Sequence, residues 1–397
     1  MIIKQRVKGF VCLTAHPIGC KQNVREQIGF VETNFTKSSN LPKNVLVIGG
    51  TTGYGLASAL TASFGCDANV LCVGYEKQAD NGRTATAGFY NSSAFLEYAS
   101  LQGKYAKCVF GDAFSDKCKS MVADIVSTEM GKIDLLIYSL ASPKRLHPKT
   151  GVLYQSVLKP YGKEFVSKNL VMETGVINQV TLQPATLQEK ENTIAVMGGE
   201  DWRLWIEFLS QKNLLSANAK TIAYSYIGPK FTHAIYKDGT IGAAKQHLKD
   251  TADSLNVDFG SSGLRAYVSI QKALVTQASS AIPVVPLYIS ILYDIMKKSN
   301  THEHCIEQIV RLFKKLTTKI ELDKEGYIRL DDWEMDKVVQ DEVARRWNIV
   351  DTDNVNALAD IEGYKSDFLK LFGFGHGSID YEKDIEEKAN EKNVVFI

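Results

Sequence analysis

Short, nearly continuous apolar runs alternate along the first half of the chain with segments that carry small and apolar residues at helical spacing. The first four runs are NVLVIGG (44–50), ANVLCVGYE (68–76), AKCVFGDAF (106–114) and IDLLIYSLA (133–141). Strands without polar alternation are buried on both faces, which is typical of a parallel sheet covered by helices. KTIAYSYIG (220–228) predicts one more strand, and AYVSIQKALV (266–275) predicts another that leads into a helix. The pattern therefore predicts an α/β fold, a Rossmann-type doubly wound parallel sheet.

Two regions interrupt this alternation. Residues 145–200 contain proline, glycine and polar residues with weak periodicity, and we expect them to form a hairpin or a small substrate-binding cap over the site. Residues 290–397 form a further helical and hairpin region. Because no linker rich in proline, glycine or serine is visible, we expect one compact unit over 1–397 with a Rossmann core at about 40–290.

The C-terminal region has its own pattern. Apolar residues at helical spacing predict helices in HCIEQIVRLFKKL (304–316) and VVQDEVARRWNIV (338–350). Between them, IELDKEGYIRLDDW (320–333) predicts two short strands around a turn. The same segment loosely resembles a calcium loop, but its first and last positions do not fit one, and we interpret it as a hairpin turn.

Composition limits the choice of partner and compartment. The net charge of +1 and the 45% hydrophobic content predict a soluble globular protein. So small a net charge creates no overall electrostatic field that would favour binding to nucleic acid or to a membrane surface. The seven cysteines include no C-x-x-C pair, which favours reduced thiols in the cytoplasm. The longest uncharged stretch, ASSAIPVVPLYISILY (278–293), is too short to span a bilayer and contains two prolines. We therefore expect no signal peptide and no membrane insertion.

A glycine-rich loop follows the first predicted strand and precedes a helix. Gly49, Gly53 and Gly55 stand in G-x-x-x-G-x-G spacing within VIGGTTGYGLASAL. A tight turn and the close approach of a pyrophosphate both require residues without a Cβ, and the helix N-terminus adds partial positive charge. This strand–loop–helix context predicts dinucleotide binding. The candidate cofactor residues in the loop are Gly49, Gly50, Thr51, Thr52, Gly53 and Tyr54.

The ends of the later strands supply further candidate cofactor contacts. Glu76, beside Tyr75, follows the loop by about 20 residues, the offset at which an acidic residue binds the adenosine ribose. A carboxylate there accepts hydrogen bonds from the free ribose diol and repels a 2′-phosphate, which favours NADH over NADPH. The alternative is that Glu76 is a solvated residue at the end of a strand. Sheet topology places two more pairs at the cofactor, Asp112 and Ala113 at the adenine, and Leu140 and Ala141 at the nicotinamide.

Reductases of this fold commonly use a tyrosine and a lysine four residues apart on one helix face. Tyr226 and Lys230 match this spacing, but the glycine and proline between them disfavour a continuous helix. Tyr293 and Lys297 also match, and we interpret them as one turn of an amphipathic helix. Neither pair is a strong catalytic candidate.

Tyr236 and Lys245 are nine residues apart in AIYKDGTIGAAKQ, so a single helix would place them on opposite faces. They can converge only if a helix begins between them. Asp238-Gly239 is a turn signal and Thr240 is a plausible N-cap, which would put Lys245 in the second turn and Tyr236 in the preceding loop. Spacing alone leaves open the alternative that this stretch is a surface hairpin.

The chain resembles the FabV/Ter-type trans-2-enoyl reductases, which are similar to short-chain dehydrogenases but use a Tyr-x8-Lys pair. The motifs that carry the resemblance run in order through nearly the whole chain: GGTTGYGLA, GRTATAGFYN, DAFS, YSLASPKR, MGGEDW, TIAYSYIGP, IYKDGTIGAAK and KALVTQASSAIPVVPLY. This resemblance implies NADH-dependent reduction of the double bond of trans-2-enoyl thioesters, carried by CoA or by acyl carrier protein, by a monomer. The alternative is a carbonyl reductase of the same fold.

The resemblance also implies roles for individual residues. Tyr236 would be the catalytic acid, Lys245 its partner and a cofactor ligand, and Tyr226 a second hydroxyl that touches the substrate. Leu274, Val275 and Thr276 would form a late contact with the nicotinamide carboxamide. We expect hydride transfer to C3, an enolate held by Tyr236, and a phenol pKa lowered by Lys245.

Two polar clusters are set apart from this site. His302, His304 and Cys305 predict a solvated helix start rather than a metal site, because too few ligands stand together. SPKRLHPK (142–149) is basic and could meet CoA phosphates or an acidic carrier protein, but we interpret it as a solvated loop. We expect no metal.

Overall fold

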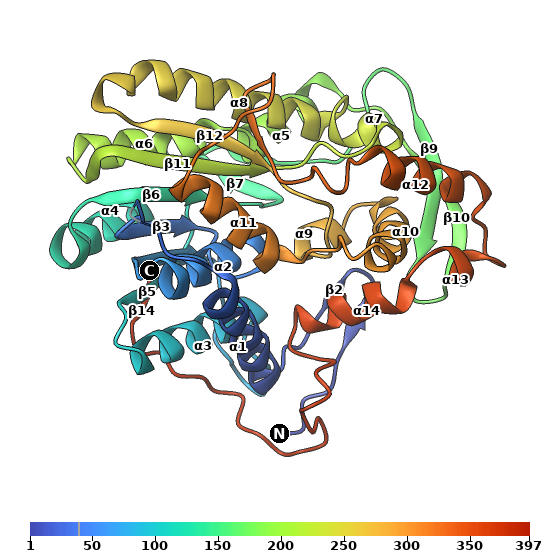
Figure 1. The fold of residues 1–397 in the computed structure, drawn as a ribbon, viewed down its shortest axis with the longest axis horizontal. Helices are drawn as coiled ribbons and strands as arrows, with labels where there is room; N and C mark the ends of the chain where they lie inside the picture. Colours follow the sequence, from blue (N-terminus) through green and yellow to red (C-terminus); the bar gives the residue numbers. More distant parts are fainter. Residues whose placement is uncertain (39) are drawn as a thin grey trace.

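The buried apolar runs form the centre of an eight-stranded sheet whose strands all pair in parallel, in the order β13-β12-β11-β6-β3-β4-β5-β14. The computed structural model (Figure 1) describes residues 1–38 and 40–397. The strands are β3 (Asn44–Ile48), β4 (Asn69–Gly74), β5 (Ala106–Phe110), β6 (Ile133–Tyr138), β11 (Leu215–Ser225), β12 (Arg265–Ile270), β13 (Tyr327–Arg329) and β14 (Val394–Phe396). Read from β5 to β12, this is the strand order of a dinucleotide-binding Rossmann sheet, which confirms the predicted fold class.

Helices cover both faces of the sheet, because side chains alternate between the faces along each strand. Val45 and Val47 pack into one hydrophobic cluster, and Leu46 and Ile48 into another. The first cluster includes α1 (Pro17–Asn34), α2 (Gly53–Leu60), α3 (Ala87–Leu101), α10 (Val285–Lys298) and α11 (Cys305–Thr317). The second includes α4 (Asp116–Ile125), α6 (Glu200–Gln211) and α8 (Thr240–Asp258). The sheet is therefore doubly wound, as the sequence predicts.

Both edge strands come from the C-terminal region. β13 pairs in parallel with β12, and β14 pairs in parallel with β5. The sheet therefore extends beyond the expected core limit at residue 290. The prediction of two strands within 320–333 is wrong, because only β13 forms there; the preceding turn is held by Asp323, whose carboxylate accepts backbone N–H groups.

The 145–200 region contains two hairpins, and its role as a substrate-binding cap stays a prediction. β7 (Lys144–Leu146) pairs with β8 (Leu153–Gln155), and β9 (Phe165–Val171) pairs with β10 (Val176–Leu182), all antiparallel. Lys168 on β9 donates to three carbonyls at the C-terminus of α12 (Lys337–Ile349), where a cation interacts favourably with the helix dipole. This contact anchors the β9–β10 hairpin on the C-terminal helices.

The remaining elements are short or lie at the periphery. They are β1 (Val7–Lys8), β2 (Val11–Cys12), α5 (Leu187–Met197), α7 (His233–Tyr236), α9 (Gln277–Ser280), α13 (Val355–Leu358) and α14 (Ile361–Lys370). All seven cysteines are free thiols. Among the described helices, none is long and apolar enough to cross a bilayer.

Candidate active site

The glycine loop lies at the carboxyl ends of β3 and β6, where the strand order reverses and α/β sheets bind their ligands. Gly49 has φ +82°, and a Cβ built on it would lie 2.3 Å from the carbonyl oxygen of Ser139. A Cβ on Gly55 would lie 1.9 Å from the carbonyl oxygen of Gly49. Glycine is thus required at both positions, and the loop, α2 and the segment after β6 pack backbone against backbone.

Glu76 lies at the end of β4 and binds back to the glycine loop. Its carboxylate accepts hydrogen bonds from Thr51 Oγ1, at 2.5 Å, and from Thr86 Oγ1. Burial raises the pKa of the carboxyl group. The alternative of a simply solvated Glu76 is therefore wrong. Tyr75 is 74% exposed, and both residues line a cavity of about 410 Å³ that also contacts Gln277 of α9.

The residues predicted after β5 and β6 lie at the same edge of the sheet. The Asp112 carboxylate accepts a hydrogen bond from the backbone N–H of Phe114 at 3.0 Å, and the carbonyl of the buried Ala113 accepts one from the Lys119 ammonium at 3.2 Å. Leu140 is half-buried and Ala141 is exposed. All four follow the carboxyl ends of β5 and β6, and their contacts with the adenine and the nicotinamide stay predictions.

The late segment after β12 reaches the glycine loop. Leu274 and Val275 are buried, and Thr276 caps α9 by accepting a hydrogen bond from a backbone N–H. The Cγ2 of Thr276 lies 3.9 Å from the position that a Cβ on Gly53 would occupy. The hydroxyl of Tyr54 donates to the carbonyl of Lys272, so α2 is tied to the same segment.

Tyr236 and Lys245 lie on two different helices. Tyr236 is the last residue of α7, and α8 begins at Thr240, so Lys245 is in its second turn as predicted. The hairpin alternative is therefore wrong, and so is the placement of Tyr236 in a loop. Thr240 is not the N-cap either: Gly239 holds that position, and the Thr240 hydroxyl donates to the carbonyl of Val157 at 2.5 Å.

The electrostatics of this pair differ from the expectation. Tyr236 is 7% exposed. Burial is the largest cause that raises the pKa of its phenol, and the nearby Glu334 is the second. Burial lowers the pKa of Lys245 to about 8. The predicted lowering of the phenol pKa by Lys245 is therefore wrong for the protein on its own, because desolvation outweighs any effect of the cation.

The Tyr226 ring contacts the Tyr236 ring, and the Tyr226 hydroxyl lies close to a buried acid. The two tyrosine rings meet edge to face with centroids 4.9 Å apart. The Tyr226 hydroxyl lies 3.0 Å from Glu334 Oε1, within hydrogen-bond distance, and Glu334 is fully buried. Sequence reasoning missed Glu334, its partner Tyr288, and Lys272, whose pKa burial lowers to about 8. Glu334 follows two aspartates, and that acidic run is typical of a solvated turn.

The two literal Tyr-x-x-x-Lys matches have structural roles. Lys297 lies over the ring of Tyr293 on α10, 4.7 Å from its centroid, as expected for one turn of a helix. Tyr226 and Lys230 are separated by the loop that contains Gly228, at φ +73°.

Both clusters expected to be solvated are partly buried. The His302 ring packs on Tyr293 with centroids 4.4 Å apart, and burial lowers its pKa. In the basic loop, Arg145 is 1% exposed and pairs with Glu200 at 2.7 Å, while His147 contacts the same carboxylate. The solvated interpretation is therefore wrong for these residues, because distant parts of the chain cover them.

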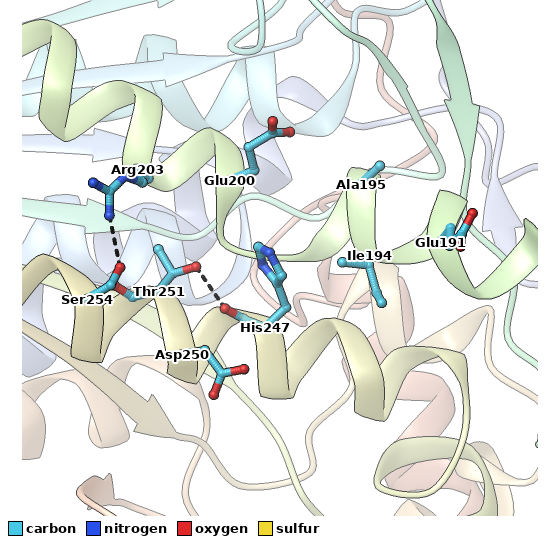
Figure 2. Close-up of a pocket in the computed structure, with 9 residues that line it drawn as sticks. All are labelled: Glu191, Ile194, Ala195, Glu200, Arg203, His247, Asp250, Thr251 and Ser254. Carbon is cyan, nitrogen blue, oxygen red and sulfur yellow. Dashed lines mark hydrogen bonds between the residues drawn. The ribbon is translucent and has the colours of Figure 1, made fainter. Parts of the chain in front are cut away.

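A separate cavity of about 560 Å³ lies among α5, α6 and α8. Figure 2 shows the residues that line it: Glu191, Ile194, Ala195, Glu200, Arg203, His247, Asp250, Thr251 and Ser254. His247 follows Lys245 by two residues on α8, so the two side chains leave nearly opposite faces of the helix. This cavity is therefore distinct from the site around Tyr236.

Three family models match the chain. They are the trans-2-enoyl-CoA reductase catalytic region at 83–317, the NAD(P)H binding domain of trans-2-enoyl-CoA reductase at 2–81, and an enoyl reductase FAD binding domain at 322–385. The last segment does not fit a flavin dinucleotide. Where a phosphate loop would need glycines after its strand, β13 is followed by Asp331 and Asp332, whose carboxylates pair with arginines. The glycine loop at 49–55, by contrast, fits the pyrophosphate of NAD.

Relatives and solved structures agree with these matches over nearly the full length. The chain is 50% identical over 398 residues to an enoyl-[acyl-carrier-protein] reductase [NADH] of Flavobacterium psychrophilum, covering 100% of both chains. It is 50% identical over 396 residues to the enzyme of that name from Coxiella burnetii, covering 98% and 97% of the two chains. The crystal structure of Treponema denticola trans-2-enoyl-CoA reductase in complex with NAD superposes with a TM-score of 0.94 at 44% identity, covering 98% and 99%. The chain therefore belongs to the trans-2-enoyl-CoA reductase family.

Proposed function

We propose that this chain uses NADH to reduce the C2–C3 double bond of trans-2-enoyl thioesters in fatty acid synthesis, with Tyr236 and Lys245 as its catalytic pair. Bound NADH supplies a hydride, which is added to C3. The observation that carries the assignment is the hydroxyl of Tyr236. It is buried beside Tyr226 and makes no hydrogen bond to another described residue, so it is free to bind an oxygen of the substrate.

Tyr236 donates a hydrogen bond to the thioester oxygen as negative charge develops there. A preorganised donor aimed at developing charge is usually the largest catalytic contribution. Lys245, with its pKa lowered to about 8, is still mostly cationic at neutral pH, and its charge stabilises the enolate and holds the cofactor ribose. Tyr226 contributes the second hydroxyl at the substrate.

The residues that would hold the cofactor lie at the carboxyl ends of the central strands. The loop 49–54 would bind the pyrophosphate, and the segment Leu274–Thr276 would contact the nicotinamide. Glu76 lies at the cavity beside Tyr75, where its carboxylate would repel a 2′-phosphate and so favours NADH over NADPH. The substrate carrier is CoA or an acyl carrier protein, and the enzyme works as a monomer in the cytoplasm.

Two measurements test this assignment. Initial rates with crotonyl-CoA and with acetoacetyl-CoA separate an enoyl reductase from a carbonyl reductase, and only the first substrate should oxidise NADH. Tyr236→Phe should lower kcat about 100-fold or more with little change in the NADH dissociation constant. Tyr98→Phe, near the far end of α3, is the matched control and should keep its rate. Near wild-type turnover of Tyr236→Phe would refute the role of this tyrosine.

A further inference from the structure

Glu334 is a buried acid that the mechanism above does not use. It lies in the turn between β13 and α12 and has no exposed surface. Its Oε2 accepts the backbone N–H of Ala273 at 2.7 Å. Its Oε1 lies 2.5 Å from the Tyr288 hydroxyl and 3.0 Å from the Tyr226 hydroxyl. One oxygen of this carboxyl group is therefore shared by two phenols, one of which reaches the substrate.

The direction of each hydrogen bond follows from Gln340. Its amide nitrogen donates to the backbone carbonyl of Glu334 at 2.7 Å and to the Tyr288 hydroxyl oxygen at 3.2 Å. Because Tyr288 accepts there, its own proton points to Glu334 Oε1. If Glu334 is ionised, Tyr226 must also donate to Oε1, and its proton points away from the substrate. If Oε1 carries a proton, it donates to Tyr226, whose proton is then free.

The surroundings of Glu334 favour the neutral acid. Its charged neighbours are Lys272 after β12 and Asp331 on its own turn. The titratable phenols near it are Tyr54 on α2, Tyr226 after β11, Tyr236 on α7 and Tyr288 on α10. No cationic nitrogen of the described residues lies within 4.0 Å of its carboxyl group, and Lys272 donates instead to the carbonyl of Ala273. Burial and Asp331 raise the pKa of Glu334, whereas its hydrogen bonds and Lys272 lower it, and burial is the largest cause.

We propose that Glu334 is a positioning residue that works in its protonated form: the chain of donors Gln340, Tyr288, Glu334 and Tyr226 aims the Tyr226 proton at the thioester oxygen. No proton needs to move along this chain during turnover, because its only task is to fix which way each hydroxyl points. The inference rests on the proposed function, since it takes the Tyr226 hydroxyl to face the substrate.

The kinetic test compares Glu334→Gln with the wild type from about pH 6 to about pH 10, because burial raises the pKa of the Glu334 carboxyl group above its ordinary value. A glutamine amide donates to Tyr226 at every pH, whereas Glu334 stops donating when it ionises. We therefore expect the ratio of kcat/KM, variant over wild type, to rise about tenfold with pH. In a Tyr226→Phe background the same ratio should stay flat, and this double variant is the control. A flat ratio in the parent background overturns the proposal.

A second readout does not depend on the reaction. The infrared difference spectrum between the wild type and Glu334→Gln at neutral pH should contain the C=O stretch of a protonated carboxylic acid, replaced by carboxylate bands at high pH. Carboxylate bands at neutral pH overturn the protonated state even if enoyl reduction is confirmed. Conversely, a chain that does not reduce enoyl thioesters refutes the proposed function whichever bands are seen. The two failures are thus distinguishable.

Discussion

Replacing Gly55 by alanine should weaken NADH binding by opening the glycine loop. The added Cβ would lie 1.9 Å from the carbonyl oxygen and 2.8 Å from the carbonyl carbon of Gly49. Both are backbone atoms, so no side chain can rotate to make room. The loop must move away from α2 by about 1.5 Å before the contact with the carbonyl oxygen becomes an ordinary van der Waals distance.

The expected size of the effect follows from this clash. Overpacking of a closely packed site costs about 1–3 kcal/mol, and each 1.4 kcal/mol is about tenfold in an equilibrium constant. Because we propose that the displaced backbone holds the pyrophosphate, cofactor binding would first have to restore the loop. We therefore expect the NADH dissociation constant to rise by about 5- to 150-fold.

Calorimetric titration with NADH measures this change directly. Gly103→Ala is the control: Gly103 has φ +67°, but a Cβ there would meet open space near the end of α3. It should lower stability by about 1 kcal/mol through its backbone conformation and leave NADH affinity unchanged. If Gly55→Ala binds NADH as tightly as the wild type, the packing of the loop against α2 does not control binding and the reasoning fails.

Two further predictions concern buried charges. Lys119→Met leaves the carboxylate of Asp201, which is 1% exposed, without its partner at 2.8 Å. It should lower the free energy of unfolding, measured in urea, by about 3–5 kcal/mol. The control on the same helix, Lys117→Met at an exposed position, should lower it by less than about 0.5 kcal/mol, and equal losses would contradict the prediction. Lys245 has a pKa of about 8 when folded against 10.5 as its ordinary value, so the unfolded chain binds more protons between these values and stability should rise with pH across that window. Lys245→Met should reduce that rise in the urea midpoint, and an unchanged rise would show that Lys245 is not desolvated.

The parallel sheet and the glycine loop could be predicted because local sequence determines them. Short apolar runs that end in glycine or a turn signal favour strands buried on both faces. The loop needs glycine at Gly49 and Gly55 because a Cβ at either position would clash with backbone atoms. The predicted hairpin within 320–333 failed for the opposite reason. Its polar and apolar residues alternate as in a hairpin, but the partner of β13 is β12, which lies far away in the sequence.

Buried polar residues were the main source of error at the site. Glu334, His302 and Arg145 are surrounded by polar residues in the sequence, and such runs are typical of solvated turns. Their partners come from distant segments, as when Ala273 and Tyr226 meet Glu334. The mistaken N-cap at Thr240 has the same cause, because a tertiary acceptor takes its hydroxyl. Local propensity does not report such contacts.

The joint between α7 and α8 has a consequence for recognising distant relatives. A Cβ on Gly242 would lie 1.8 Å from the carbonyl oxygen of Lys237, so the first turn of α8 packs directly on the joint. The interval between Tyr236 and Lys245 therefore combines a connector, residues 237–239, with the first turns of α8, and it is not a count of turns along one helix. Gaining or losing one residue inside a single helix would rotate the lysine by about 100°, whereas a change within the connector need not rotate either helix. A pattern search for distant relatives should therefore look for a tyrosine at the end of one helix and a lysine in the second turn of the next helix, rather than for a fixed helical spacing.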